Sequence, residues 1–302
     1  MKNNLINSKI LISSKMGIYS NFYNDIYFDK LNGIKESEHV YLNTNKLKEK
    51  FKNKQKFVVA ELGFGAGLNF LLTWKLWKEN RKSNASLTYI SFENAPLSKK
   101  EISRVYKKIK NLDQYSNILL KNIPERYQST HRIHFKSDNV NLILIYEDIN
   151  SLLNFNFRAD TWFLDGFSPK KNKLAWTDKL FRQIYNFTNL DGSLSTFSVA
   201  GHIRRGLLKA GFKVSKVSGH GNKKEISYAI KKNPDNSKLF KVNCYKSIGP
   251  VAIIGSGISG ASLAFALRKR NIECFVIDKS NEIGSGASGN KLAIQMPKLT
   301  TD

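Results

Sequence analysis

Three glycines at alternate positions follow an acid in the stretch 57–70. The residues are Glu61, Gly63, Gly65 and Gly67, preceded by an apolar run and followed by an expected amphipathic helix. Glycine lets the backbone turn sharply against a ligand, and a helix N-terminus presents unpaired N–H groups to an anion such as a carboxylate. A dinucleotide site more often reads Gly-x-Gly-x-x-Gly, with its acid one strand later. The acid-first spacing therefore favours S-adenosylmethionine (SAM), with the glycines around its methionine end and Glu61 supporting it. The alternative is a tight turn without a ligand.

Two later acids also follow expected strands. Glu93 ends the stretch 87–93, where a carboxylate can bind both hydroxyls of a ribose; its alternative role is to cap a helix that begins near Leu97. Asp148 follows the buried run 142–146 and can accept a hydrogen bond from an adenine amino group, or it is only a turn residue. Both positions are consistent with a nucleoside ligand, because the carboxyl ends of parallel strands meet at one edge of a sheet.

Asp165 is the strongest candidate for a catalytic residue. It ends the apolar run 161–164 and is followed by Gly166, Phe167 and a proline. A carboxylate at this edge can orient an amine and accept its proton, and an aromatic ring can stack on a base. The alternative is that Asp165 only caps the following turn.

A second glycine motif lies near the end of the sequence, in the stretch 251–278. Gly255, Gly257 and Gly260 have the spacing Gly-x-Gly-x-x-Gly within an expected strand–helix–strand unit, and Asp278 ends its second strand. In that context the motif indicates dinucleotide binding, because the glycines approach a pyrophosphate and the acid holds a ribose.

The charge balance favours a polyanionic partner. Lys and Arg number 49 against 24 Asp and Glu, which gives a net charge of +25. Nucleic acid is the first candidate for such a partner, and solvation of an ordinary surface is the alternative. The candidate phosphate contacts are Arg204, Arg205, Lys223 and Lys224.

Other compositional features narrow the class of protein. Hydrophobic residues make up 41% of the sequence, which supports a packed core. Cys244 and Cys274 form no disulfide framework or metal motif. Lys9 and Lys15 interrupt the first apolar run, so we expect no signal peptide, and no segment is long and apolar enough to span a membrane. The expected location is the cytoplasm.

The order of predicted elements indicates an α/β fold. We expect a turn at 32–33, a strand at 39–42, a helix at 68–80, mainly helix over 98–140, and a helix at 201–211. Strands are expected at 57–61, 87–93, 142–146, 161–165, 193–197, 212–217 and 225–230. Alternating strands and helices that end in an antiparallel hairpin are typical of the Rossmann-like class I SAM-dependent methyltransferases. We expect this domain over residues 1–232, a charged linker over 233–249, and a dinucleotide-binding βαβ segment over 250–302.

Six segments resemble the MnmC family, bifunctional bacterial enzymes that complete 5-methylaminomethyl-2-thiouridine at the tRNA wobble position. They are 25–28, 61–70, 92–93, 162–172, 200–207 and 219–225. The resemblance implies that this part of the chain methylates the amine of 5-aminomethyl-2-thiouridine with SAM, and that Asp165 is the catalytic residue. It also implies that residues 250–302 begin an FAD-dependent oxidoreductase half, which in the family removes a carboxymethyl group.

We expect that oxidoreductase half to be incomplete, because the sequence ends at Asp302 and so short a segment buries too little surface for a stable oxidase. A separately encoded oxidoreductase half is then a candidate partner, besides the anticodon region of tRNA. Two other interpretations remain open: an FAD-dependent oxidoreductase fragment, and a noncatalytic RNA-binding module.

Overall fold

The computed structural model describes residues 5, 10–13, 17–20, 25–28, 33–109, 111–166, 176–221, 223–233, 249–270 and 272–292. The chain divides into two compact units, residues 1–242 and 243–302. The division falls within the segment 233–249 that we expected to be a linker, while the narrower domain boundaries stay predictions. Each unit is described by itself.

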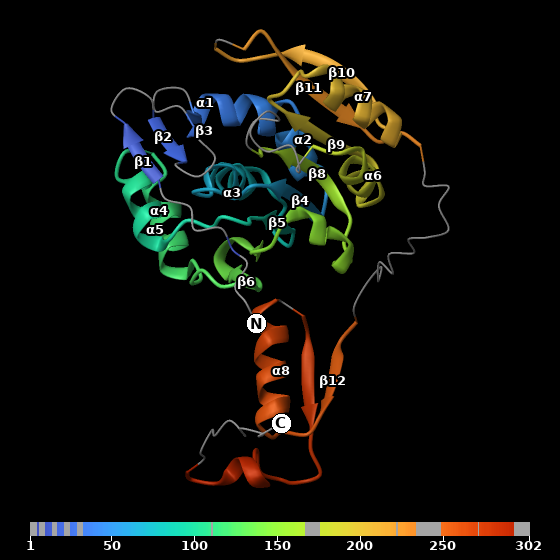
Figure 1. The fold of residues 1–302 in the computed structure, drawn as a ribbon. Coiled ribbons are helices and arrows are strands. Elements are labelled where there is room, and N and C mark those ends of the chain that lie inside the picture. Colours follow the sequence, from blue (N-terminus) through green and yellow to red (C-terminus); the bar gives the residue numbers. More distant parts are fainter. Residues whose placement is uncertain are drawn as a thin grey trace, which may run out of the picture. The chain divides into compact units, whose positions relative to one another are not determined.

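An eight-stranded sheet forms the centre of the first unit, in the order β10-β11-β9-β8-β4-β5-β7-β6 (Figure 1). Strands β4, β5, β7, β8 and β9 run parallel, whereas β6 and β11 are antiparallel to their neighbours. Because β4 has β5 on one side and β8 on the other, the strand order reverses direction at β4. Open α/β sheets bind their ligands at this topological switch point, beside the carboxyl ends of the strands. The strands are β4 (Lys56–Leu62), β5 (Ser86–Phe92), β6 (Thr130–Phe135), β7 (Val140–Ile145), β8 (Ala159–Leu164), β9 (Thr188–Thr196), β10 (Lys213–Ser218) and β11 (Glu225–Ile230).

Helices cover both faces of this sheet (Figure 1). Buried residues of η1 and α2 to α5 form one hydrophobic core, and those of η3, α6 and α7 form the other. The helical elements are α1 (Gly33–Ser37), the π-helix η1 (Glu38–Asn43), α2 (Leu47–Asn53), α3 (Leu68–Asn80), α4 (Lys99–Tyr106), α5 (Asp113–Asn122), the 3-10 turns η2 (Lys136–Asp138) and η3 (Ile149–Asn154), α6 (Asp178–Asn186) and α7 (Gly201–Ala210).

The alternation of side chains along the strands decides which core each residue joins. In β4, Phe57 and Val59 belong to the core beside α3, whereas Ala60 and Leu62 belong to the opposite core. Successive strand residues point to opposite faces, so Glu61 is on the face that α3 covers. We call this face of the sheet the α3 face.

The structure corrects two of the expected elements. Residues 39–42 lie in the π-helix η1 rather than a strand, and three consecutive side chains there are buried, Val40, Tyr41 and Leu42. Residues 98–140 are not mainly helical, because β6 follows α4 and α5 and pairs with β7. The strand β6 is a partly exposed edge with polar residues at several positions, so its sequence gives no clear alternation. The expected turn at 32–33 is replaced at Gly33 by the start of α1, and Asn32 lies outside the described residues.

The other expected elements of the first unit are confirmed. They include α3, α7 and the antiparallel hairpin of β10 and β11. A separate antiparallel sheet near the N-terminus contains β1 (Ile10–Ser13), β2 (Gly17–Ser20) and β3 (Asp25–Phe28).

The second unit is a small βαβ arrangement. It contains β12 (Val251–Ile254), α8 (Ile258–Lys269), β13 (Cys274–Ile277) and the 3-10 turn η5 (Ala287–Gly289), and β12 and β13 are parallel, as the motif predicts. Ile253 is the one buried hydrophobic residue in the described part of this unit, whereas Phe265 is 64% exposed and Ile254 is 90% exposed. The βαβ unit therefore has almost no core of its own.

Candidate active site

The glycine loop between β4 and α3 depends on left-handed backbone conformations. The φ angles of Gly63, Gly65 and Gly67 are +86°, +52° and +82°. A Cβ atom on Gly67 would lie 2.7 Å from the ring of Phe64, and one on Gly63 would lie 3.1 Å from the carbonyl oxygen of Asp165. Side chains are disfavoured here by both conformation and space, so the loop keeps its backbone close to the ends of β4 and β8.

Glu93 contacts this loop directly. Its Oε2 accepts a hydrogen bond of 2.9 Å from the N–H of Gly65, and its Oε1 accepts one of 2.8 Å from the N–H of Ala95. Burial raises the pKa of Glu93, and these backbone hydrogen bonds oppose the rise. The structure thus brings the second predicted acid to the glycine loop, where each carboxylate oxygen retains a further lone pair.

Glu61 is buried on the α3 face, with 1% of its surface exposed. Asn69 Nδ2 donates to its Oε1 at 3.0 Å, and Ser91 Oγ donates to its Oε2 at 2.8 Å. Burial, and secondly the charge of Asp165, raise the pKa of Glu61 to about 8. Near neutral pH this residue is therefore largely a neutral acid in the absence of a cation.

Asp165 lies at the carboxyl end of β8 and is held by two side-chain donors. The hydroxyl of Tyr41 donates to Oδ1 at 2.6 Å, and Asn69 Nδ2 donates to Oδ2 at 2.6 Å. Burial raises the pKa of Asp165 to about 6, and the two hydrogen bonds oppose the rise. A carboxylate with this pKa can accept a proton close to neutral pH.

Three residues of this cluster were missed by the sequence reasoning, namely Tyr41, Asn69 and Ser91. The alternation of strand residues could have indicated Ser91, since it has the same parity along β5 as Tyr89 of the adjoining core. Asn69 lies in the first turn of α3, immediately after the glycines. No local pattern indicates Tyr41, because it comes from η1, 124 positions before Asp165.

Asp148 follows strand β7 and lies outside the hydrogen-bond cluster that Asn69 forms with Glu61 and Asp165. It caps η3, where its side chain accepts a hydrogen bond of 2.9 Å from the N–H of Asn150. Its other oxygen is 3.5 Å from Asn94 Nδ2, just after β5. The alternative that we considered, a turn residue, agrees with this position at the start of the 3-10 turn η3, and a contact with adenine stays a prediction. Phe167, the candidate stacking ring, lies outside the described residues.

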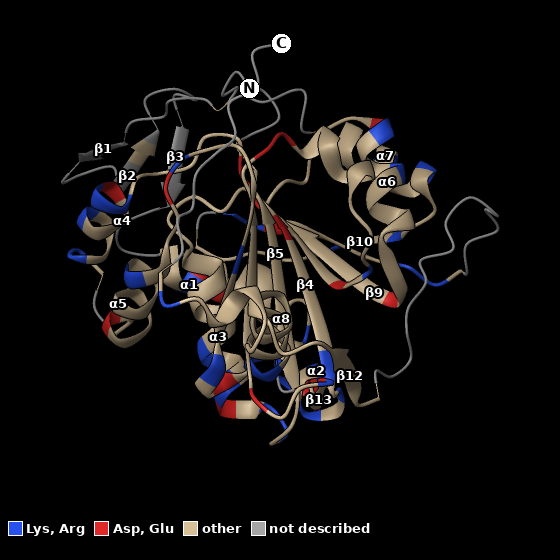
Figure 2. Cartoon of the chain, turned by 90° about the horizontal axis from the view of Figure 1, so that it is seen from below, with Lys and Arg blue, Asp and Glu red and all other residues tan. Residues whose placement is uncertain are grey.

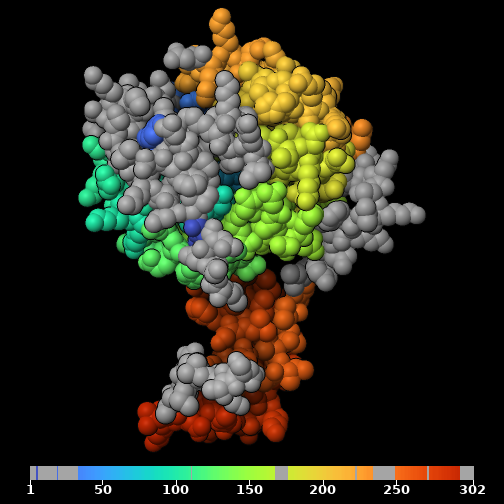
Figure 3. Space-filling view, in the orientation of Figure 1, coloured from blue at the N-terminus to red at the C-terminus, as the bar shows by residue number. Residues whose placement is uncertain are grey.

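The four candidate phosphate contacts have different surroundings. Arg205 and Lys224 are exposed, whereas Arg204 is half-buried and its Nε donates to Val199 O at 3.2 Å. Lys223 forms an ion pair with Glu36 and lies 4.5 Å from the ring centre of Phe197. Blue Lys and Arg positions are spread over the outer helices in Figure 2, and the α7 and β10–β11 region is on the surface of the first unit in Figure 3.

The predicted dinucleotide-binding motif, Gly255, Gly257 and Gly260, lies between β12 and the first turn of α8. A Cβ atom on Gly260 would lie 1.9 Å from the carbonyl oxygen of Gly255, so only glycine fits at this crossing. Gly257 precedes the first turn of α8. Asp278 Oδ2 accepts hydrogen bonds from the N–H and the hydroxyl of Ser256, at 2.6 and 2.7 Å. Hydrogen bonds from the backbone of Ser280 and from Ser256 lower the pKa of Asp278 to about 2, so it is an ionised acceptor.

The described residues contain no group of three or more His, Cys, Asp or Glu residues arranged to hold a metal ion. Among the helices in the described ranges, none combines the length and the hydropathy that crossing a membrane requires.

Comparisons with known proteins agree with this division of the chain. Residues 110–232 match the family model described as S-adenosyl-L-methionine-dependent methyltransferase, and residues 250–301 match the model described as FAD dependent oxidoreductase. These matches name SAM as the cofactor class of the first unit and FAD as that of the second. The fold of the first unit is accordingly that of the class I methyltransferases, with its hairpin, and the second unit corresponds to the start of an FAD-binding fold.

Curated relatives match across both units. A protein of Hahella chejuensis, named tRNA 5-methylaminomethyl-2-thiouridine biosynthesis bifunctional protein MnmC, is 37% identical over 275 residues, which cover 90% of this chain and 43% of that protein. A protein of the same name from Maricaulis maris is 35% identical and covers 95% of this chain and 48% of its own length. Over nearly all of its length, this chain is similar to MnmC proteins. It spans less than half the length of these MnmC relatives.

A solved structure supports the fold. The crystal structure of MNMC2 from Aquifex aeolicus superposes with a TM-score of 0.62 at 23% identity, covering 76% of this chain and 71% of that one.

The residues of the first unit fit SAM. The left-handed glycines carry no side chain at the start of α3, where Gly63 and Gly65 are half-buried, and the Oδ1 atom of Asn69 is buried with no hydrogen-bond partner among the described residues. This buried acceptor lies beside two carboxylates, which suits a positively charged group. The second unit fits the pyrophosphate and ribose of a dinucleotide through Gly255, Gly257, Gly260 and Asp278.

Proposed function

We propose that this protein methylates the amine of 5-aminomethyl-2-thiouridine at the wobble position of tRNA, giving 5-methylaminomethyl-2-thiouridine. The observation that carries the proposal is the pair of hydrogen bonds that holds Asp165 beside the glycine loop, at the switch point of a methyltransferase sheet. The net charge of +25 supports a polyanionic substrate such as tRNA. The names of the MnmC relatives supply the identity of the nucleoside.

We assign the cofactor site to the backbone of Gly63, Gly65 and Gly67 and to three acids. Glu61 and Asn69 would contact the methionine end, Glu93 the ribose and Asp148 the adenine. When bound, SAM supplies a methyl group on a sulfonium that is already activated, so the protein mainly has to hold the two reactants in line.

Asp165 would orient the acceptor amine. An alkylammonium has no lone pair for attack, so the reacting form is the neutral amine. Its nitrogen forms the new bond to the methyl carbon as the carbon–sulfur bond breaks, and the resulting ammonium loses one proton. Asp165 can hydrogen-bond this nitrogen before the reaction and accept that proton, because its pKa of about 6 lies close to neutral pH.

We propose that the tRNA anticodon region contacts Arg204, Arg205 and Lys224 on the surface of the first unit, with Lys223 available once its contact with Glu36 opens. A tRNA substrate would place the protein in the cytoplasm. The oxidative removal of the carboxymethyl group belongs to the FAD-dependent half of the family. Because the described part of the second unit has almost no core, we assign this oxidation to a more complete or separately encoded half.

The test is methyl transfer by the wild-type protein and by Asp165→Asn. Hypomodified tRNA would be incubated with labelled SAM, and the wobble nucleosides analysed by mass spectrometry. Asparagine keeps the size of the side chain but is a much poorer base, so single-turnover rates should fall by roughly 10²–10⁴-fold. SAM affinity should change little, because Asp165 is assigned to the acceptor.

The matched control is Asp178→Asn, which removes an exposed carboxylate on α6. It should methylate at the wild-type rate. An Asp165→Asn protein that also methylates at that rate would limit Asp165 to a structural cap, and a collapse of SAM affinity would move it to the cofactor site. No labelled wobble nucleoside with the wild-type protein would refute the proposed activity.

A further inference from the structure

Three described side chains donate hydrogen bonds to Asp165 or Glu61, namely Tyr41, Asn69 and Ser91. Of these three, Tyr41 alone comes from outside the sheet and helix α3. Its hydroxyl donates to Asp165 Oδ1 at 2.6 Å, and its ring packs against that of Phe163 with centres 5.2 Å apart. The side chain is 3% exposed. It is therefore held in the core with its polar end on the candidate catalytic carboxylate.

The backbone of Tyr41 is also fixed. It lies in the π-helix η1, a rare conformation that occurs often at functional sites. Asn45, which is fully buried, donates through Nδ2 to the carbonyl oxygen of Tyr41 at 2.8 Å and to Ser195 Oγ at 2.7 Å. Asn45 thereby ties η1 to strand β9 of the sheet.

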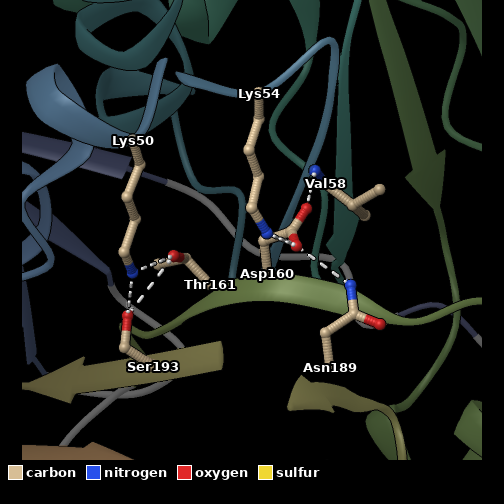
Figure 4. A network of polar contacts seen from close by, with 7 residues as sticks. All are labelled: Lys50, Lys54, Val58, Asp160, Thr161, Asn189 and Ser193. Atoms are coloured by element: carbon tan, nitrogen blue, oxygen red, sulfur yellow. Dashed lines mark hydrogen bonds and ion pairs between the residues drawn. The ribbon is translucent and has the colours of Figure 1, made fainter. Parts of the chain in front are cut away.

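A polar network extends this connection towards the start of the strands. Ser193 Oγ donates to Asn45 Oδ1 at 2.7 Å, and Lys50 Nζ donates to Ser193 Oγ at 2.7 Å. Figure 4 shows Lys50 reaching down from α2 to Ser193 and Thr161, beside the separate contacts of Lys54 with Asp160. The network joins α2, η1, β8 and β9, and so fixes the position from which Tyr41 reaches Asp165.

We propose that Tyr41 is a positioning residue for the methyl transfer, whose hydroxyl holds one oxygen of Asp165 and thereby aims the remaining lone pairs of the carboxylate at the acceptor amine. This inference rests on the proposed function. The donor stabilises the charged form of Asp165, because a hydrogen bond to a carboxylate favours ionisation. Burial, and the charge of Asp165, raise the pKa of Tyr41 well above its ordinary value, so its hydroxyl remains a donor throughout the neutral range.

Other titratable groups also act on Asp165 and must be held constant in a test. The positive charge of Lys223, on the β10–β11 loop, lowers the pKa of Asp165, and the charge of Glu36, on α1, raises it. Glu61 on β4 interacts with Asp165, and Tyr89 on β5 lies within the influence of both acids. Removing one hydroxyl from Tyr41 changes none of these groups.

The variant is Tyr41→Phe, which keeps the ring and removes the donor. Loss of one hydrogen bond to the carboxylate should raise the pKa of Asp165 by about one unit. The ratio of wild-type to variant single-turnover rates should then be about five times larger at pH 6 than at pH 8. A substitution that only loosened the structure would lower the rate by the same factor at both pH values. SAM affinity, measured by calorimetry, should change by less than about twofold.

A second readout is independent of catalysis. Carboxyl carbons labelled with ¹³C in aspartate would report the titration of Asp165, assigned with Asp165→Asn, in the wild type and in Tyr41→Phe. The matched control is Tyr185→Phe, which removes a hydroxyl hydrogen bond to Asn233 O on the opposite core of the sheet and should leave the titration unchanged. An upward shift in Tyr41→Phe alone supports the inference.

The two proposals fail in different ways. If Asp165 titrates at the same pH in Tyr41→Phe and wild type, or if the rate ratio does not depend on pH, the positioning role of Tyr41 is overturned while the methyltransferase activity stands. If the wild-type protein transfers no methyl group to tRNA, the proposed function is refuted, and with it the role of Tyr41 in that reaction.

Discussion

Replacing Glu61 with glutamine should make the protein more stable at alkaline pH. In the fold, burial raises the pKa of this carboxyl from 4.5 to about 8. Between these values the folded protein holds a proton that the unfolded chain has released. Stability from this group is therefore fully present below pH 4.5 and is lost as the pH rises towards 8. Glutamine mimics the neutral acid and carries no such proton.

The size of the effect follows from the same pKa. One pKa unit corresponds to about 1.4 kcal/mol, and between pH 6 and pH 8 the folded carboxyl stays mostly protonated while the unfolded one is ionised. The wild-type protein should lose roughly 2 kcal/mol of unfolding free energy over this range through Glu61. The side-chain donors remain compatible with the variant, because an amide oxygen can accept from Asn69 and the hydroxyl of Ser91 can accept from an amide N–H.

The assay is urea unfolding of the SAM-free protein at pH 6, 7 and 8, for the wild type, Glu61→Gln and Asp178→Asn. Taking the difference between proteins removes the titration of groups that they share, including Lys50, whose pKa burial lowers to about 8. The gap between Glu61→Gln and the wild type should widen by roughly 2 kcal/mol from pH 6 to pH 8, and Asp178→Asn should show no such widening. A constant gap would refute the assignment of a neutral, buried Glu61.

Two other outcomes are expected. The affinity for tRNA, measured by fluorescence titration, should fall at least tenfold between about 50 and 200 mM salt, because the protein displaces counterions from phosphates; a flat dependence would argue against a phosphate-dominated interface. Deleting residues 243–302 should leave the single-turnover rate of methyl transfer within about twofold of wild type, because every residue assigned to that reaction lies in the first unit. The undeleted 302-residue chain should purify colourless, because the described part of its second unit has almost no core to hold a flavin. Stoichiometric flavin absorbance would contradict this expectation.

The local sequence was sufficient to predict the acids and glycines at the ends of the strands. A strand delivers its last residue to a known edge of a parallel sheet, and alternate glycines permit the left-handed turn that follows, so Glu61, Gly63 and Gly65 could be placed without coordinates. The same reasoning placed Glu93 and Asp165 at that edge. The edge strand β6 and the π-helix η1 were not predicted, because their patterns of burial depend on neighbouring elements rather than on a local period.

Only the tertiary structure decided how these acids are partnered and which of them hold protons. Tyr41 reaches Asp165 across 124 positions of sequence, Asn69 donates to two carboxylates at once, and Lys223 pairs with Glu36. The raised pKa values of Glu61 and Asp165 come first from burial, which is the combined effect of every element packed around them. Sequence thus determined the chemical types at the end of each strand, whereas packing determined their protonation and orientation, because desolvation and long-range hydrogen bonds exist only once the chain has folded.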